Sequence, residues 1–190
     1  MASTASPYGL LPVNLIGGGP YQGGTLREFP VNSNVGTAIF NGQLVVLSTA
    51  GLPAGVVASP VAQNLAATSA QPTAGIVGVC QGCSYISAEG QLLFKNFLPA
   101  DLVTGGATEV KLLVNDDPNS VFKIQGAAAI GSLTGGAAAC VGTNGAVSTF
   151  TGSITTGKSA MALAVGSNGG SLAATATLAF RVIGVVPGTE

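Results

Sequence analysis

Residues 108–125, Thr-Glu-Val-Lys-Leu-Leu-Val-Asn-Asp-Asp-Pro-Asn-Ser-Val-Phe-Lys-Ile-Gln, decide the fold class of this chain. In the first half Val110, Leu112 and Val114 share one face and Lys111 lies on the other with Leu113, and in the second half Phe122 and Ile124 share one face. A period of two is typical of a strand with one buried face. Asx residues and a proline separate the halves, and such residues stabilise turns. The stretch therefore predicts an antiparallel hairpin, around which the other strands pack.

Further short apolar runs lie on both sides of this stretch, and turn residues separate them. Residues 36–47 place two apolar runs around Asn41-Gly42, a dipeptide that accepts the backbone of a type I′ turn and so predicts a second hairpin. Residues 73–85 and 91–98 read as two more strands, joined by a turn at Glu89-Gly90. Many short strands and frequent turns predict an all-β fold with little helix, either a compact β-sandwich or a small β-barrel.

The first 30 residues differ from the rest, and we expect them to form an extended N-terminal arm on a body domain of residues 31–190. Four prolines in this segment exclude a regular helix. Its apolar side chains are too many for a solvated linker: Tyr8, Leu10, Leu11, Val13, Leu15 and Ile16. Such a segment needs a second surface, which is either its own body or a neighbouring subunit. In the second case these six side chains are the candidate partner-binding residues.

Charged residues make up only 7% of the 190 residues, and the net charge is −1. No basic patch exists to hold a phosphate backbone, so we expect no binding to nucleic acid. No apolar run reaches the roughly 20 residues that span a bilayer, and the first residues lack the basic start of a signal peptide. We therefore expect no membrane association and a protein that stays in the cell where it is made, or leaves it by lysis.

Catalytic residues are hard to find in this composition. Histidine, the commonest general base, is absent. A pair of carboxylates could serve glycoside hydrolysis, and five acids are candidates on paper: Glu89, Asp101, Glu109, Asp116 and Asp117. Each of them has a turn or strand-edge explanation instead. We therefore expect that the protein is not an enzyme.

Three patterns are similar to cofactor or metal sites, and each has a simpler explanation. Residues 152–159, Gly-Ser-Ile-Thr-Thr-Gly-Lys-Ser, match the phosphate-binding loop, but no helical stretch or aspartate follows them. Cys80, Cys83 and Cys140 give three thiols where structural zinc takes four ligands, and on a regular strand Cys80 and Cys83 face opposite sides, so buried free thiols are expected. Residues 115–119 lack the ligand spacing of a calcium loop. We expect no cofactor and no metal.

Blocks along nearly the whole chain carry a resemblance: residues 1–18, 37–45, 75–79, 83–85, 114–125, 152–159 and 177–184. In this order they resemble small virion structural proteins of tailed bacteriophages. The resemblance implies a head-decoration, or cement, protein on the outer surface of the virion capsid. Such proteins are made in the host cytoplasm, bind the major capsid protein, often as a homotrimer, and bridge adjacent capsomers against the pressure of packaged DNA.

This resemblance brings no catalytic residues, and it implies that residues 152–159 form a surface loop. An alternative within the same class is a tail-associated or receptor-binding virion protein. The two alternatives predict different copy numbers. Cement proteins approach the copy number of the major capsid protein, whereas tail proteins are present in small multiples.

Overall fold

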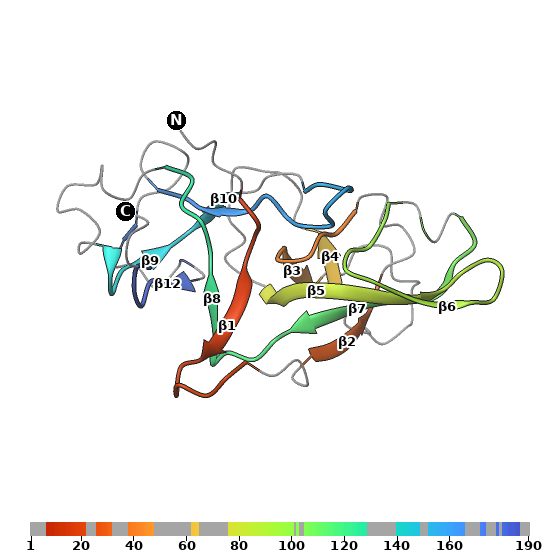
Figure 1. Cartoon of the computed structure of the whole chain (residues 1–190), viewed down its shortest axis with the longest axis horizontal. Coiled ribbons are helices and arrows are strands. Elements are labelled where there is room, and N and C mark those ends of the chain that lie inside the picture. The colour runs from red at the N-terminus through yellow and green to blue at the C-terminus, as the bar shows by residue number, and fades with distance from the viewer. Residues whose placement is uncertain are drawn as a thin grey trace.

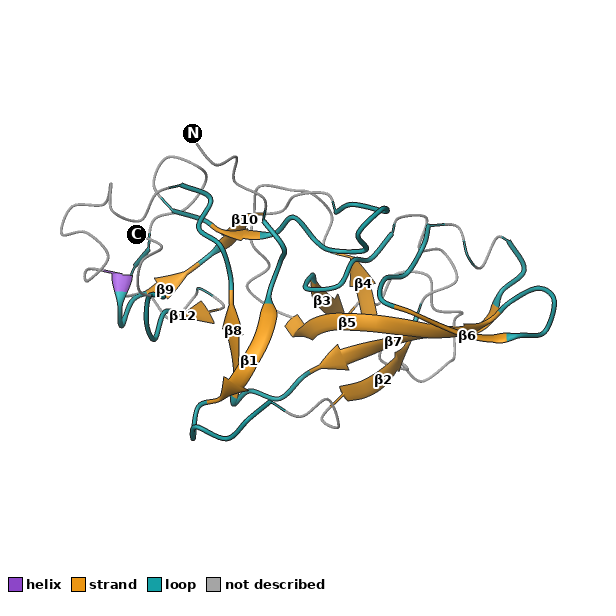
Figure 2. Cartoon of the chain, in the orientation of Figure 1, coloured by secondary structure: helices purple, strands orange, loops and turns teal. Residues whose placement is uncertain are grey.

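Strands make up almost all of the regular structure (Figures 1 and 2). The computed structural model describes residues 7–21, 26–31, 38–47, 62–64, 76–100, 102, 105–128, 140–148, 152–165, 172–173, 178 and 180–186. Within them the strands are β1 (Leu11–Leu15), β2 (Leu26–Pro30), β3 (Leu44–Leu47), β4 (Ala62–Asn64), β5 (Ile76–Ile86), β6 (Leu92–Lys95), β7 (Thr108–Asn115), β8 (Ser120–Lys123), β9 (Asn144–Gly145), β10 (Val147–Ser148), β11 (Ala162–Leu163) and β12 (Phe180–Arg181). These residues contain no α-helix, which confirms the expected all-β class.

One open, antiparallel sheet forms the centre of the molecule. Its strand order is β2-β7-β5-β3-β4, and β6 pairs with the far end of β5. Three two-stranded antiparallel sheets accompany it: β1–β8, β10–β11 and β12–β9. No sheet closes on itself among the strands described, so the barrel alternative is not observed there.

Both expected strands of residues 108–125 exist, but their expected pairing as a hairpin is wrong. β7 buries Val110, Leu112 and Val114 on one face, as the alternation predicts. Its two edges are taken by β2 and β5, so β8 has no edge of β7 to join and pairs with β1 instead. The intervening turn leads the chain out of the large sheet into a small one.

Side-chain bonds hold this turn. The Asn115 amide donates to Ser120 Oγ at 2.9 Å, and Asn115 Oδ1 accepts the Asp117 N–H at 3.1 Å. Asp117 Oδ1 in turn accepts the Asn119 N–H at 2.9 Å. The Asx residues therefore do stabilise a turn, and only its role in the topology differs from the expectation.

Residues 36–47 also turn where expected without forming a hairpin. The Gln43 N–H donates to the Phe40 carbonyl at 3.1 Å, and Gly42 has a φ of 81°. Asn41 has no positive φ, so the turn is closer to type II than to type I′. Type II turns splay the flanking strands, and here Ile39 bridges to Leu98 whereas β3 pairs with β4 and β5.

Two apolar clusters lie on opposite faces of the large sheet. Neighbouring residues of β3 mark the faces, since Val45 belongs to the first cluster and Leu44 to the second. The buried members of the first cluster are Phe29, Ile39, Val45, Cys80, Cys83, Tyr85, Leu98, Ala107, Val110, Leu112 and Val114. Those of the second are Leu10, Leu44, Val79, Val147 and Met161. The small sheets contribute to the second cluster, so they pack on that face.

The described strands of the N-terminal segment are extended and pair with strands of the body. β1 pairs with β8, and β2 pairs with β7 over five residues. The prolines lie at strand positions where the missing backbone N–H does little harm to the pairing. Pro12 lies beside a β-bulge, and Pro30 ends β2. The alternative in which the segment lies against its own body therefore holds for these residues. Residues 1–6 lie outside the described part.

Candidate functional site

Pairing of β1 with β8 divides the six candidate partner-binding residues into two groups. Leu10 is only 2% exposed in the second cluster, so it is a core residue and not a contact for a partner. Leu11, Val13 and Ile16 are 45%, 52% and 65% exposed. Tyr8 and Leu15 are half-buried. Leu11 and Val13 of β1, and Ile16 in the turn after it, thus remain available to another molecule.

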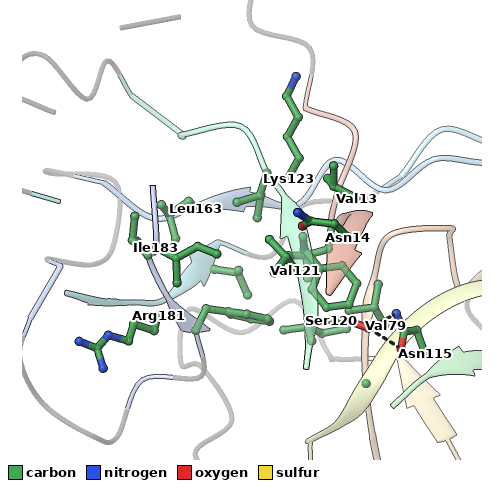
Figure 3. Close-up of a pocket in the computed structure, with 18 of the residues that line it drawn as sticks. Val13, Asn14, Val79, Asn115, Ser120, Val121, Lys123, Leu163, Arg181 and Ile183 are labelled. Atoms are coloured by element: carbon green, nitrogen blue, oxygen red, sulfur yellow. Dashed lines mark hydrogen bonds between the residues drawn. The ribbon is translucent and has the colours of Figure 1, made fainter. Parts of the chain in front are cut away.

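A hollow of about 1140 Å³ lies beside β1, between the small sheets and one end of the large sheet (Figure 3). Apolar side chains line it: Leu44, Val79, Phe122 and Phe180 belong to the second cluster or pack against it, and Leu163 and Ile183 lie beside them. In Figure 3, Leu163 and Ile183 lie on one side and Val13 and Val121 on the other. Pockets for small ligands hold roughly 300–1000 Å³, so this hollow is slightly larger than that range.

Polar groups of the hollow lie mainly at its rim. Asn115 is buried there, but its amide is already bonded to the turn described above. Lys123 and Arg181 are exposed lining residues, and their charged ends point away from the apolar side chains (Figure 3). Asp116 and Asp117 line the hollow as well, so its apolar side chains are accompanied by charges of both signs.

The hairpin of β5 and β6 carries a second apolar surface, which the sequence analysis did not single out. Leu92 and Phe94 are 62% and 68% exposed, whereas Leu93 packs against the first cluster. The sequence does contain a signal for this surface, because Leu92-Leu93-Phe94 places apolar side chains on both faces of a strand. β6 is an edge strand whose only strand partner in the described chain is β5, and the face that carries Leu92 and Phe94 is exposed.

Residues 152–159 form a loop that is unable to hold phosphate in the manner of a nucleotide-binding loop. The N–H groups of five loop residues already donate within the chain: Ser153, Thr156, Gly157, Lys158 and Ser159. The loop is tied to Asn41, whose carbonyl accepts the Ser159 N–H at 2.8 Å. It leads into β11 and not into a helix. These bonds support the prediction of a surface loop.

The acidic residues are not gathered into a site within the described ranges. Asp116 pairs with Arg27 at 3.1 Å, and Asp117 stabilises the turn after β7. No group of three potential metal ligands occurs among the described residues. Asp101 lies outside them. The described part also contains no helix with the length and hydropathy that a transmembrane helix requires.

All three cysteines are buried thiols outside any disulfide, as expected, but the expected orientation of two of them is wrong. Cys80 and Cys83 both belong to the first cluster, on one face of the large sheet. The register of β5 against β7 shifts between Cys80 and Gly82, so a β-bulge adds one residue between the two thiols. The extra residue restores both side chains to the same face.

The burial of Cys80 and Cys83 predicts that the protein loses stability at alkaline pH. Burial raises the pKa of Cys80 to about 12 and that of Cys83 to about 11, from 9.0. The folded protein therefore keeps two protons that the unfolded chain releases above pH ~9. The stabilisation is complete below that pH and is lost as the pH rises towards the folded pKa values, by up to about 1.4 kcal/mol per pH unit for each thiol.

Denaturant unfolding at pH 7 to 10.5 measures this loss, and labelling with a thiol reagent at pH 8 tests the burial. We expect labelling of the native protein to be slow compared with that of the unfolded chain. A Cys80→Ala variant is the control, because it lacks one of the two titrations. A free energy of unfolding with the same pH dependence in both proteins would contradict the prediction.

Known protein families, curated proteins and solved structures gave no match to this chain. A functional proposal therefore rests on the sequence resemblance and on the surfaces of the described residues.

Proposed function

We propose that this protein is a structural virion protein that decorates the outside of a tailed-phage capsid and stabilises it by bridging major capsid protein subunits. The sequence blocks that resemble small virion proteins suggest this class. In the structure, the observation that supports it is the exposure of the apolar side chains of Leu11 and Val13 on β1 and of Ile16 in the turn after it. No catalytic cluster competes with this surface among the described residues, and we propose that the protein acts by binding alone.

The chemistry of β1 suits a groove between protein subunits. Its side chains offer apolar anchors, and on its edge away from β8 the described chain makes only the Asn14–Pro20 bridge, near the end of the strand. An extended segment of this kind gains affinity from main-chain bonds and specificity from side-chain pockets. The large sheet holds β1 in place through β8 and Leu10, so little ordering is required when it binds.

Attachment to a symmetric shell also gains from repetition. A homotrimer that binds at three points raises the effective concentration of the second and third contacts, so weak single contacts suffice. Few charges take part, because charged residues are 7% of the chain. We therefore expect attachment to depend weakly on ionic strength.

Titration onto undecorated heads tests the proposal. We expect the double variant Leu11→Ser with Val13→Ser to bind at least tenfold more weakly, since burial of one such side chain is worth about 1.5–3 kcal/mol. Ile154→Ser is the matched control, because Ile154 is 74% exposed in the loop 152–159. A steep loss of wild-type binding with salt, or equal binding by all variants, would reject β1 as the capsid contact.

The number of copies per particle separates this function from its alternative. A cement protein appears at hundreds of copies, near the major capsid protein, on a gel of purified particles. A small multiple per particle would instead assign the chain to the tail or to a receptor-binding structure.

A further inference from the structure

The backbone of β6 has one edge that no strand of the described chain takes. Where the hairpin turns, the Ser87 N–H donates to the Gln91 carbonyl at 2.8 Å. Hydrogen-bonded and non-bonded pairs alternate along an antiparallel ladder, so the next residue of β6 that bonds to β5 is Leu93. The N–H and C=O groups of Leu92 and Phe94 therefore point away from β5, towards the free edge.

This edge lacks the features that usually protect a sheet from a further strand. Charged side chains and proline are two such features. The edge strand β2 has both, since it carries Arg27 and Glu28 and ends in Pro30. β6 has no proline, and the two residues whose backbone faces its free edge are Leu92 and Phe94, at 62% and 68% exposure. The edge of β6 is therefore suited to strand addition.

A second β6 fits this edge in the antiparallel direction. When a twofold axis passes beside Leu93, Leu92 of each copy lies opposite Phe94 of the other, and the outward backbone groups of both strands pair. A shift by two residues in one direction would set Phe94 opposite Gly90. The same shift in the other direction would set Leu92 opposite Asn96. The centred register alone gives each of the exposed apolar side chains an apolar neighbour across the strands.

Exposed charges at the two ends of the strand fit the same register. It places Lys95 of one copy opposite Gln91 of the other, next to the hairpin tip that carries Glu89. Lys95 and Glu89 are both exposed, and the twofold axis makes their approach occur twice. Opposite charges that meet across an interface fix its register and disfavour other partners. This match favours a second copy over an unrelated segment as the occupant of the edge.

We propose that two copies of this chain join through β6, so that their large sheets form one continuous antiparallel sheet across a twofold axis. The same surface of each copy takes part, so the contact is isologous. Main-chain hydrogen bonds supply affinity, and the side chains set the register. β6 lies at the end of the large sheet far from β1, so the contact goes beyond the capsid contact proposed above (Figure 1). Because it is twofold, it can link two homotrimers as well as two single chains.

Cysteine cross-linking of the purified protein tests the register. Leu92→Cys and Phe94→Cys are prepared separately, mixed and oxidised; the native thiols are buried. Opposite residues of a bonded antiparallel pair have Cα atoms about 5.5 Å apart, which suits a disulfide, whereas identical residues lie on the longer diagonal. We expect a cross-linked dimer in the mixture and much less in either preparation alone. Ile154→Cys replaces Phe94→Cys in the control mixture, because Ile154 is 74% exposed on another loop.

Charge reversal tests whether the occupant is a second copy. Glu89→Lys and Lys95→Glu are each expected to weaken self-association about fivefold in sedimentation at low ionic strength, because two exposed ion pairs are lost. The double variant should regain wild-type association, since the charges are then exchanged in both copies. Lys158→Glu is the control, because Lys158 is an exposed lysine of the loop 152–159. Circular dichroism and thermal unfolding check that each variant keeps its fold.

Three results would overturn the proposal. The first is a wild-type protein that does not self-associate at the highest soluble concentration. The second is a Leu92→Cys preparation that cross-links alone as readily as the mixture does, which would mean another register or another contact. The third is association that the single charge reversals leave unchanged, or that the double variant does not regain, which would leave the edge to another occupant, such as a capsid segment. No capsid is used in these experiments, so failure here is distinct from failure of the decoration role.

Discussion

Replacement of Leu112 by alanine is expected to lower the free energy of unfolding by about 2–5 kcal/mol, the usual range for a buried leucine. Leu112 is fully buried at the centre of β7, between β2 and β5, and belongs to the first cluster. Truncation removes its contacts and leaves a cavity that strands fixed on both sides are unable to close. Denaturant unfolding at pH 7 measures the loss.

Leu113→Ala is the matched control. It changes the same residue type, one position along the same strand, on the face where the side chain is only half-buried. We expect a clearly smaller loss of unfolding free energy for this variant, because the Leu113 side chain buries less apolar area in the folded protein than the Leu112 side chain does. Equal losses at the two positions would mean that β7 does not have one buried and one open face.

Gly9→Ala is expected to destabilise the protein by about 2–5 kcal/mol, from two sources. Gly9 has a φ of 78°, where an alanine costs about 1–2 kcal/mol. An added Cβ would also lie 2.6 Å from the Gly42 carbonyl oxygen, which accepts the Leu10 N–H at 2.9 Å. Overpacking of this kind costs about 1–3 kcal/mol more. The Gly42 carbonyl is a backbone group and the position of the Cβ is fixed by the backbone of residue 9, so neither can rotate away.

The variant Gly18→Ala separates the cost of the positive φ from the cost of the clash. Gly18 has nearly the same φ, 80°, but a Cβ there would meet nothing within 4 Å. Its loss should therefore contain the conformational cost alone, and the difference between the two variants measures how tightly the N-terminal segment is locked to the Phe40–Gln43 turn. A loss at Gly9 no greater than that at Gly18 would contradict this lock.

Local patterns in the sequence predicted strands well and their partners badly. The alternation of Val110, Leu112 and Val114 identifies a half-buried strand, because side-chain direction depends only on the backbone of that strand. The partner of β8 depends on which strand edges are already taken, and β2, from a distant part of the chain, takes the edge of β7. No local rule contains that information.

Prediction of the candidate sites has the same limit, because local patterns do not show which residues pack together in the fold. The apolar residues of the first 30 were recognised as a surface in need of a partner, but only the fold separates the core residue Leu10 from the exposed Leu11 and Val13. The bulge that turns Cys80 and Cys83 to one face is a register shift, and it leaves no mark in the sequence. The hydrogen bonds within residues 152–159 likewise could be identified only from the structure.

The pairing of the first strands with late ones has a consequence during synthesis. β2 finds its partner in β7, and β1 finds β8, roughly 80 to 110 residues further along the chain. At about 5–20 residues per second, both strands leave the ribosome roughly 4–22 s before their partners exist. During that time their apolar side chains are open to chaperones and to aggregation, so slower translation should lower the yield of folded protein.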